Sequence, residues 1–112
     1  MEQLRFEYAA GAPAARRVLV GVVGSGDLEV IIEPGTAGTT SIDVTTSING
    51  YGRVWDAQLT RVFSAEPRAA MKIRIHDFGA TPGVVGMRLA EAFEALEGPE
   101  AIGGAAASKE SA

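Results

Sequence analysis

Apolar and polar residues alternate along several short stretches of this 112-residue chain, a two-residue period that indicates a strand-rich fold. Leu4, Phe6 and Tyr8 alternate with charged residues, and similar alternation returns over residues 28–33, 42–47 and 71–76. Residues 17–24 (RVLVGVVG) differ because they are apolar on both faces, as expected of a central strand covered on two sides. Five strands are therefore predicted.

Two segments follow the helical period instead. The first apolar stripe consists of Trp55, Leu59, Val62 and Phe63, on a helix of roughly residues 51–64. The second consists of Val85, Leu89, Ala92, Phe93 and Leu96. Thr81 is a suitable N-cap for this second helix, Pro82 suits its first position, and Gly98-Pro99 would end it.

The predicted order is β-β-β-β-α-β-α, with strand hairpins first and helices late. Such a chain is expected to form an α+β fold, in which two helices pack on one face of a small, mainly antiparallel sheet of about five strands. Residues 1–97 would form one domain. The small and polar residues 98–112 are predicted to be a disordered tail.

Composition excludes several classes of function. Ten Lys and Arg against fourteen Asp and Glu give a net charge of −4, which argues against a nucleic-acid partner. The chain has no Cys and a single His, so a disulfide framework, a Cys nucleophile and a metal site are not expected. No segment is typical of a membrane span or a signal peptide, and the expected location is the cytoplasm.

Gly24-Ser25-Gly26-Asp27 links two predicted strands and is the candidate functional loop. Glycines supply the backbone conformations that a tight hairpin turn demands, and Ser25 would stand exposed at its tip. Asp27 could orient the serine hydroxyl or an approaching cation. On spacing alone, a turn without any function is the favoured interpretation, because Gly, Ser and Asp are common turn residues.

Three other patterns do not support the activities they suggest. Residues 21–26 read G-x-x-G-x-G with a strand after them, which is neither a dinucleotide-binding nor a P-loop motif. The DFG triplet at 77–79 lacks the other kinase motifs. A triad of Ser25, His76 and Asp77 is disfavoured, because adjacent strand residues point to opposite faces. His76 shares a face with Lys72 and Arg74, which indicates a solvated or interface-facing strand edge.

The start of the second helix, Gly79-Ala80-Thr81-Pro82-Gly83, could hold a phosphate or carboxylate on its free N–H groups. Capping by Thr81 explains the same residues and is the favoured interpretation.

Three segments resemble the acyl carrier (delta) subunit family of malonate decarboxylase: VGVVGSGDLEV at 20–30, TSING at 46–50 and IHDFGATPGVV at 75–85. The resemblance covers about residues 2–97. It implies that Ser25, in the loop context of Gly24, Gly26 and Asp27, carries a 2'-(5''-phosphoribosyl)-3'-dephospho-coenzyme A group through a phosphodiester bond. A citrate-lyase-type carrier has a similar Ser-Gly-Asp loop, but the 75–85 segment favours malonate decarboxylase.

The resemblance also implies a division of labour. The arm would hold acetyl and malonyl thioesters, while acyltransferase and decarboxylase subunits do the chemistry and a dedicated transferase attaches the group. No residue of this chain is then expected to be catalytic. The carrier fold would not be the four-helix bundle of common acyl carrier proteins. The alternative from another class is a structural or adaptor subunit, whose partners dock on the His76 strand or the Trp55 helix.

Overall fold

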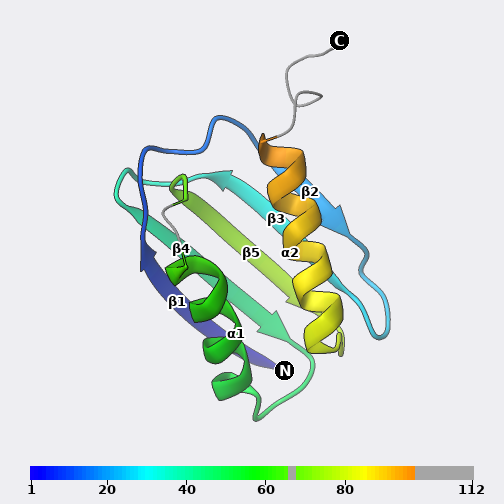
Figure 1. The fold of residues 1–112 in the computed structure, drawn as a ribbon. Helices are drawn as coiled ribbons and strands as arrows, with labels where there is room; N and C mark the ends of the chain where they lie inside the picture. The colour runs from blue at the N-terminus through cyan, green and yellow to red at the C-terminus, as the bar shows by residue number, and fades with distance from the viewer. Residues whose placement is uncertain (66–67, 98–112) are drawn as a thin grey trace.

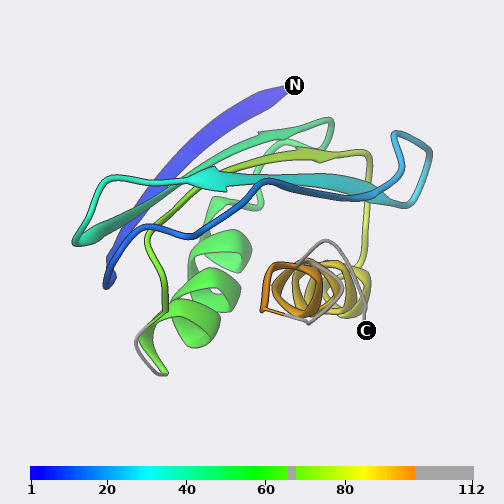
Figure 2. The same cartoon turned by 90° about the horizontal axis from the view of Figure 1, so that it is seen from above.

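The computed structural model describes residues 1–65 and 68–97 as a five-stranded mixed sheet with two helices on one of its faces (Figures 1 and 2). The elements are β1 (Glu2–Ala9), β2 (Val18–Gly21), β3 (Leu28–Pro34), β4 (Thr39–Thr46), α1 (Gly52–Ser64), β5 (Met71–Asp77) and α2 (Pro82–Glu97). The predicted α+β class and element order are confirmed. The predicted tail, 98–112, and the stop at Gly98-Pro99 lie outside the described residues.

The strands lie in the order β1-β4-β5-β3-β2. β4 and β5 are parallel, whereas the other three pairings are antiparallel. Parallel neighbours need a crossover connection, and α1 provides it between β4 and β5. The sheet is therefore mainly antiparallel, as expected, with one parallel pair at its centre.

Two details of the predicted sheet are wrong. Only one pair of consecutive strands, β2 and β3, forms a hairpin in the described residues, because β1 pairs with β4 instead. The segment 17–24 is not a central strand: β2 is four residues long and lies at the sheet edge. Leu19 is 63% exposed, and Val22 and Val23 follow the strand into the turn, also exposed. The apolar run thus reflects an exposed edge and loop rather than a strand covered on both faces.

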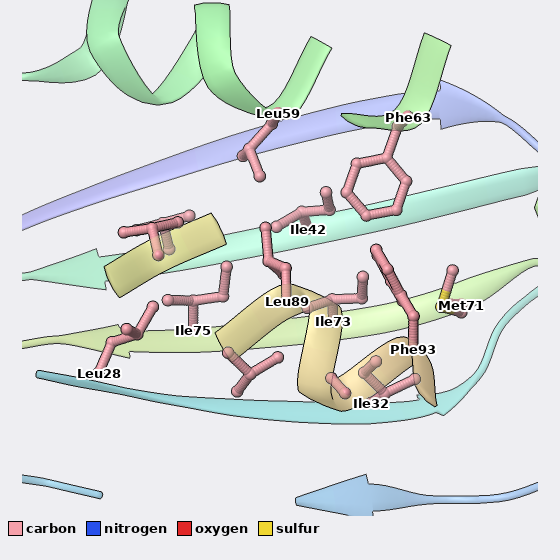
Figure 3. Packing of buried hydrophobic residues seen from close by; sticks show 14 of the residues in the cluster. Leu28, Ile32, Ile42, Leu59, Phe63, Met71, Ile73, Ile75, Leu89 and Phe93 are labelled. Carbon is pink, nitrogen blue, oxygen red and sulfur yellow. The ribbon is translucent and has the colours of Figure 1, made fainter. Parts of the chain in front are cut away.

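The core lies between the sheet and the two helices (Figure 3). Alternate residues of the three inner strands are fully buried, among them Leu28, Ile73 and Ile75. Both predicted helical stripes face them, and eight of these nine residues are buried, whereas Val62 is partly buried. Phe63 stacks on Tyr8 and makes an edge contact with Phe93, with ring centroids 5.5 and 5.6 Å apart. These aromatic contacts join α1 to both β1 and α2.

The opposite face of the sheet carries charged side chains in cross-strand pairs. Arg5 pairs with Asp43 at 3.1 Å, and His76 Nδ1 lies 2.9 Å from Glu29 Oε1. His76 shares this face with Lys72 and Arg74, as predicted, but β5 is the central strand, so the interpretation as a strand edge is wrong. Neither helix described in 1–65 and 68–97 combines the length and apolar character needed to cross a bilayer.

The topology gathers several segments at one end of the sheet (Figure 1). β2, β4 and β5 run in the same direction, so their carboxyl ends lie together. The β2–β3 turn and the starts of both helices follow directly from these ends. Segments that are far apart in sequence, around residues 25, 48 and 79, therefore meet at this end.

Candidate functional site

Ser25 lies exposed on a tight turn between β2 and β3. The Asp27 N–H donates to the Gly24 carbonyl at 3.1 Å and closes the turn. Gly26 has a φ of 77°, a left-handed conformation that costs glycine little and other residues more. A Cβ at this position would meet no atom within 4 Å, so the backbone conformation, and not the available space, favours glycine here.

The turn is tied to the loop between β5 and α2. The Gly26 N–H donates to the Phe78 carbonyl at 2.7 Å, and the Phe78 N–H donates to the Asp27 carbonyl at 2.9 Å. These bonds extend the β3–β5 ladder beyond its last strand pair, Leu28 and Asp77. Ser25 is thus exposed, but the backbone on its carboxyl side is fixed.

Asp27 forms a bidentate ion pair with Arg88 of α2. Arg88 Nε lies 3.0 Å from Asp27 Oδ1 and Nη2 lies 2.7 Å from Oδ2, while the Leu28 N–H also donates to Oδ1 at 2.7 Å. The hydrogen bonds from Arg88, and then that from Leu28, lower the pKa of Asp27 below its ordinary value. The pKa of Arg88 is raised in turn, mainly by Asp27 and next by Glu91.

This pair revises the role expected for Asp27. The sequence suggested that its carboxylate orients the serine hydroxyl or meets an approaching cation. Both carboxylate oxygens instead accept hydrogen bonds from Arg88, a cation of this chain. Asp27 therefore anchors the turn to α2. Arg88 was missed because no local pattern connects residues 61 positions apart.

Asp77 holds the neighbouring loops together from a buried position, with 4% of its surface exposed. Thr46 Oγ1 at the end of β4 donates to Asp77 Oδ2 at 2.8 Å, and the Ala80 N–H donates to Oδ1 at 3.0 Å. His76 points to the opposite face and contacts Glu29. Ser25, His76 and Asp77 are therefore not assembled as a triad.

The start of α2 is capped as predicted. The Val84 N–H donates to Thr81 Oγ1 at 3.2 Å, and the Val85 N–H donates to the Thr81 carbonyl at 2.9 Å. Gln58 Nε2 of α1 donates to the Pro82 carbonyl at 2.8 Å and joins the two helices near this point.

A pocket of about 430 Å³ opens between the starts of α1 and α2, and we call it the interhelix pocket. Its apolar wall is formed mainly by Ile48, Tyr51, Val54, Trp55, Pro82 and Val85. Gly79 also lines it, and a Cβ built on Gly79 would lie 3.9 Å from Ile48 Cδ1 and 4.0 Å from the Gly26 nitrogen. The pocket and the Ser25 turn are thus neighbours, separated by Gly79. The pocket could not be predicted from the sequence, because residues of two loops, both helices and the end of β5 form it together.

Comparison with known proteins assigns the family. Residues 15–96 match the family model described as malonate decarboxylase delta subunit (MdcD). The malonate decarboxylase acyl carrier protein of Pseudomonas paraeruginosa (strain DSM 24068 / PA7) is 58% identical over 94 residues, which cover 84% of this chain and 95% of that protein. The protein of the same name from Pseudomonas syringae pv. syringae is 56% identical over 96 residues, covering 86% and 97%.

The fold also matches a solved structure. One chain in the crystal structure of a Pseudomonas malonate decarboxylase hetero-tetramer in complex with malonate superposes with a TM-score of 0.84 and 53% sequence identity. The match covers 86% of this chain and 99% of that chain. The chain described here therefore belongs to the malonate decarboxylase delta subunit family.

Proposed function

We propose that this chain is the acyl carrier subunit of a malonate decarboxylase complex and that Ser25 is its attachment residue. The phosphodiester would join Ser25 Oγ to the phosphoribosyl unit of 2'-(5''-phosphoribosyl)-3'-dephospho-coenzyme A. The observation that carries the proposal is an exposed serine on a turn whose backbone and neighbouring Asp27 are held by Phe78 and Arg88.

The residues around Ser25 fit such a group. Gly24 and Gly26 carry no side chains that would crowd a large substituent on the hydroxyl. A phosphodiester close to a free carboxylate would be repelled, but the guanidinium of Arg88 neutralises Asp27. The turn can therefore accept one further negative charge beside Asp27.

The group, when bound, supplies a thiol that carries the acyl thioester at the end of a long arm. The part played by this chain is to hold the root of that arm in one place, so that the acyl group reaches successive sites at high effective concentration. Acyltransferase and decarboxylase subunits would perform the chemistry, and a dedicated transferase would attach the group. The similarity to a chain of a malonate decarboxylase hetero-tetramer supports such partners. Cell fractionation would test the expected cytoplasmic location.

The decisive experiment is the intact mass of the chain purified with its native partners and the transferase, followed by peptide mapping. We expect an adduct of the prosthetic group on Ser25. The adduct and the activity of the complex should both be lost in Ser25→Ala, while the free energy of unfolding changes by less than about 0.5 kcal/mol, because an exposed turn serine contributes little stability.

Ser47→Ala is the matched control, since Ser47 is also exposed and lies in a loop at the same end of the sheet. It should keep both the adduct and the activity. If Ser25→Ala supported normal activity, the carrier assignment would be wrong and a structural or adaptor role would replace it. A prosthetic group found on another residue would contradict the assignment of Ser25.

A further inference from the structure

The interhelix pocket lies next to the attachment turn, yet none of the residues that form its apolar wall takes part in the function proposed above. Gly79 lines the pocket, and a Cβ built on it would lie 4.0 Å from the Gly26 nitrogen. We propose that the interhelix pocket binds the adenosine unit of the prosthetic group that Ser25 carries. This inference rests on the proposed function and adds to it a fixed position for the root of the arm.

The walls of the pocket suit a purine. Its volume of about 430 Å³ is in the range of small-molecule sites. Trp55 is buried, whereas Tyr51 and Val54 are 53% and 45% exposed, which is high for large apolar side chains. Flat aromatic and aliphatic surfaces bind nucleic-acid bases by stacking and by removing them from water.

The two helix amino ends at the pocket suit the phosphates attached to an adenosine. Both helices begin at its rim, and neither has an acidic residue in its first turn. The amino ends of helices carry partial positive charge, which favours nearby anions. Asp77 also lines the pocket, but both of its carboxylate oxygens already accept hydrogen bonds, from Thr46 and Ala80.

The order of units along the group selects adenosine over the rest of the arm. The phosphoribosyl unit joins Ser25 to the 2' position of the adenosine, so adenosine is the nearest large apolar unit to the protein. The thiol end lies farthest away and must leave this chain to reach other subunits. Binding of the adenosine leaves that movement free and orders only the root, which lowers the entropy cost of presenting the arm to a partner.

The test is NMR on isotope-labelled chain that carries the group, compared with unmodified Ser25→Ala chain. We expect nuclear Overhauser contacts from the adenine H2 and H8 protons to the methyl groups of Ile48 and Val54. Amide shifts should change at Tyr51 and Val54 as well as around Ser25. Mass spectrometry of the same samples establishes whether the adduct is present.

Two variants distinguish binding in the pocket from a general effect of an added surface charge. Val54→Glu places a charge in the pocket wall and should abolish the adenine contacts to the Ile48 methyl groups, which this variant keeps, while the adduct is retained. Met87→Glu is the control, because Met87 is 48% exposed on α2 and lies outside the pocket lining, so the contacts should persist.

The two proposals fail in distinguishable ways. An adduct on Ser25 without adenine contacts in the pocket overturns the adenosine site alone. Contacts from the pantetheine methyl groups in place of the adenine would also overturn it. Absence of the adduct despite the transferase overturns the proposed function and the adenosine site with it.

Discussion

Arg88 and Asp27 are 61 residues apart in the chain, but two hydrogen bonds of 3.0 and 2.7 Å join their side chains beside Ser25. Bidentate guanidinium–carboxylate pairs are strong and directional. The pair has two effects on Ser25: it fixes the turn on α2, and it removes an uncompensated negative charge from the place where a phosphodiester would form. Arg88 is thus a positioning residue in the proposed carrier.

Arg88→Gln should slow the attachment of the prosthetic group several-fold without abolishing it, because Ser25 itself is retained. Amide hydrogen exchange at Gly26 should become faster, since the turn loses its anchor on α2. The measurements are the initial rate of adduct formation by mass spectrometry and the exchange rate by NMR. Arg5→Gln is the control, because Arg5 pairs with Asp43 on the far face of the sheet. Equal rates in both variants would contradict the positioning role.

The difference in stability between wild type and Arg88→Gln should depend on pH. The pKa of Asp27 is lowered from 3.8 in the folded chain, so its pairing stabilises the fold above that value and the contribution is lost as the pH falls through the folded pKa. Wild type should therefore be more stable than Arg88→Gln at neutral pH, and the difference should shrink well below pH 3.8. Urea unfolding across this range provides the measurement.

The helices and strands with a regular apolar pattern could be predicted from the sequence. Which strands lie next to one another in the sheet could not. Two-residue alternation located β1, β3, β4 and β5, and the helical stripes located α1 and α2, because apolar residues recur with the period of the buried face. The pairing of β1 with β4 and the edge position of β2 depend on contacts between distant segments. No local pattern records them, and residues 17–24 misled the prediction.

Leu19 and Leu28 test this correction by the same substitution on two paired strands. Leu28 is fully buried on β3, so Leu28→Ala should lower the free energy of unfolding by about 2–5 kcal/mol. Leu19 is 63% exposed on β2, and Leu19→Ala should change it by less than about 0.5 kcal/mol. Urea unfolding measures both. A loss of similar size for Leu19 would restore the prediction of a strand covered on two faces.

At the scale of the whole molecule, the candidate site occupies one end of the sheet. The Ser25 turn, the interhelix pocket and the starts of both helices meet there, while the core behind them positions each segment. The sequence located Ser25 and its loop, because glycines and an exposed hydroxyl mark a turn locally. The pairing of Arg88 with Asp27 and the pocket could not be predicted from the sequence, since both form only when α2 packs against the sheet beside the turn.

The candidate site lies at the start of α2, whereas the predicted domain ends at the other end of this helix. A helix of 16 residues rises about 24 Å, so Glu97 lies far from the capped start of α2 beside the Ser25 turn. The family model also ends within α2, at residue 96. We therefore expect a chain shortened to residues 1–97 to keep the thermal unfolding midpoint of the full chain and its rate of adduct formation on Ser25. A chain shortened to residues 1–88 is the control: it lacks the buried Leu89, Phe93 and Leu96 and should not fold. A slower rate for 1–97 at an unchanged midpoint would show that residues 98–112 assist the attachment, and the functional unit would then extend beyond the predicted domain.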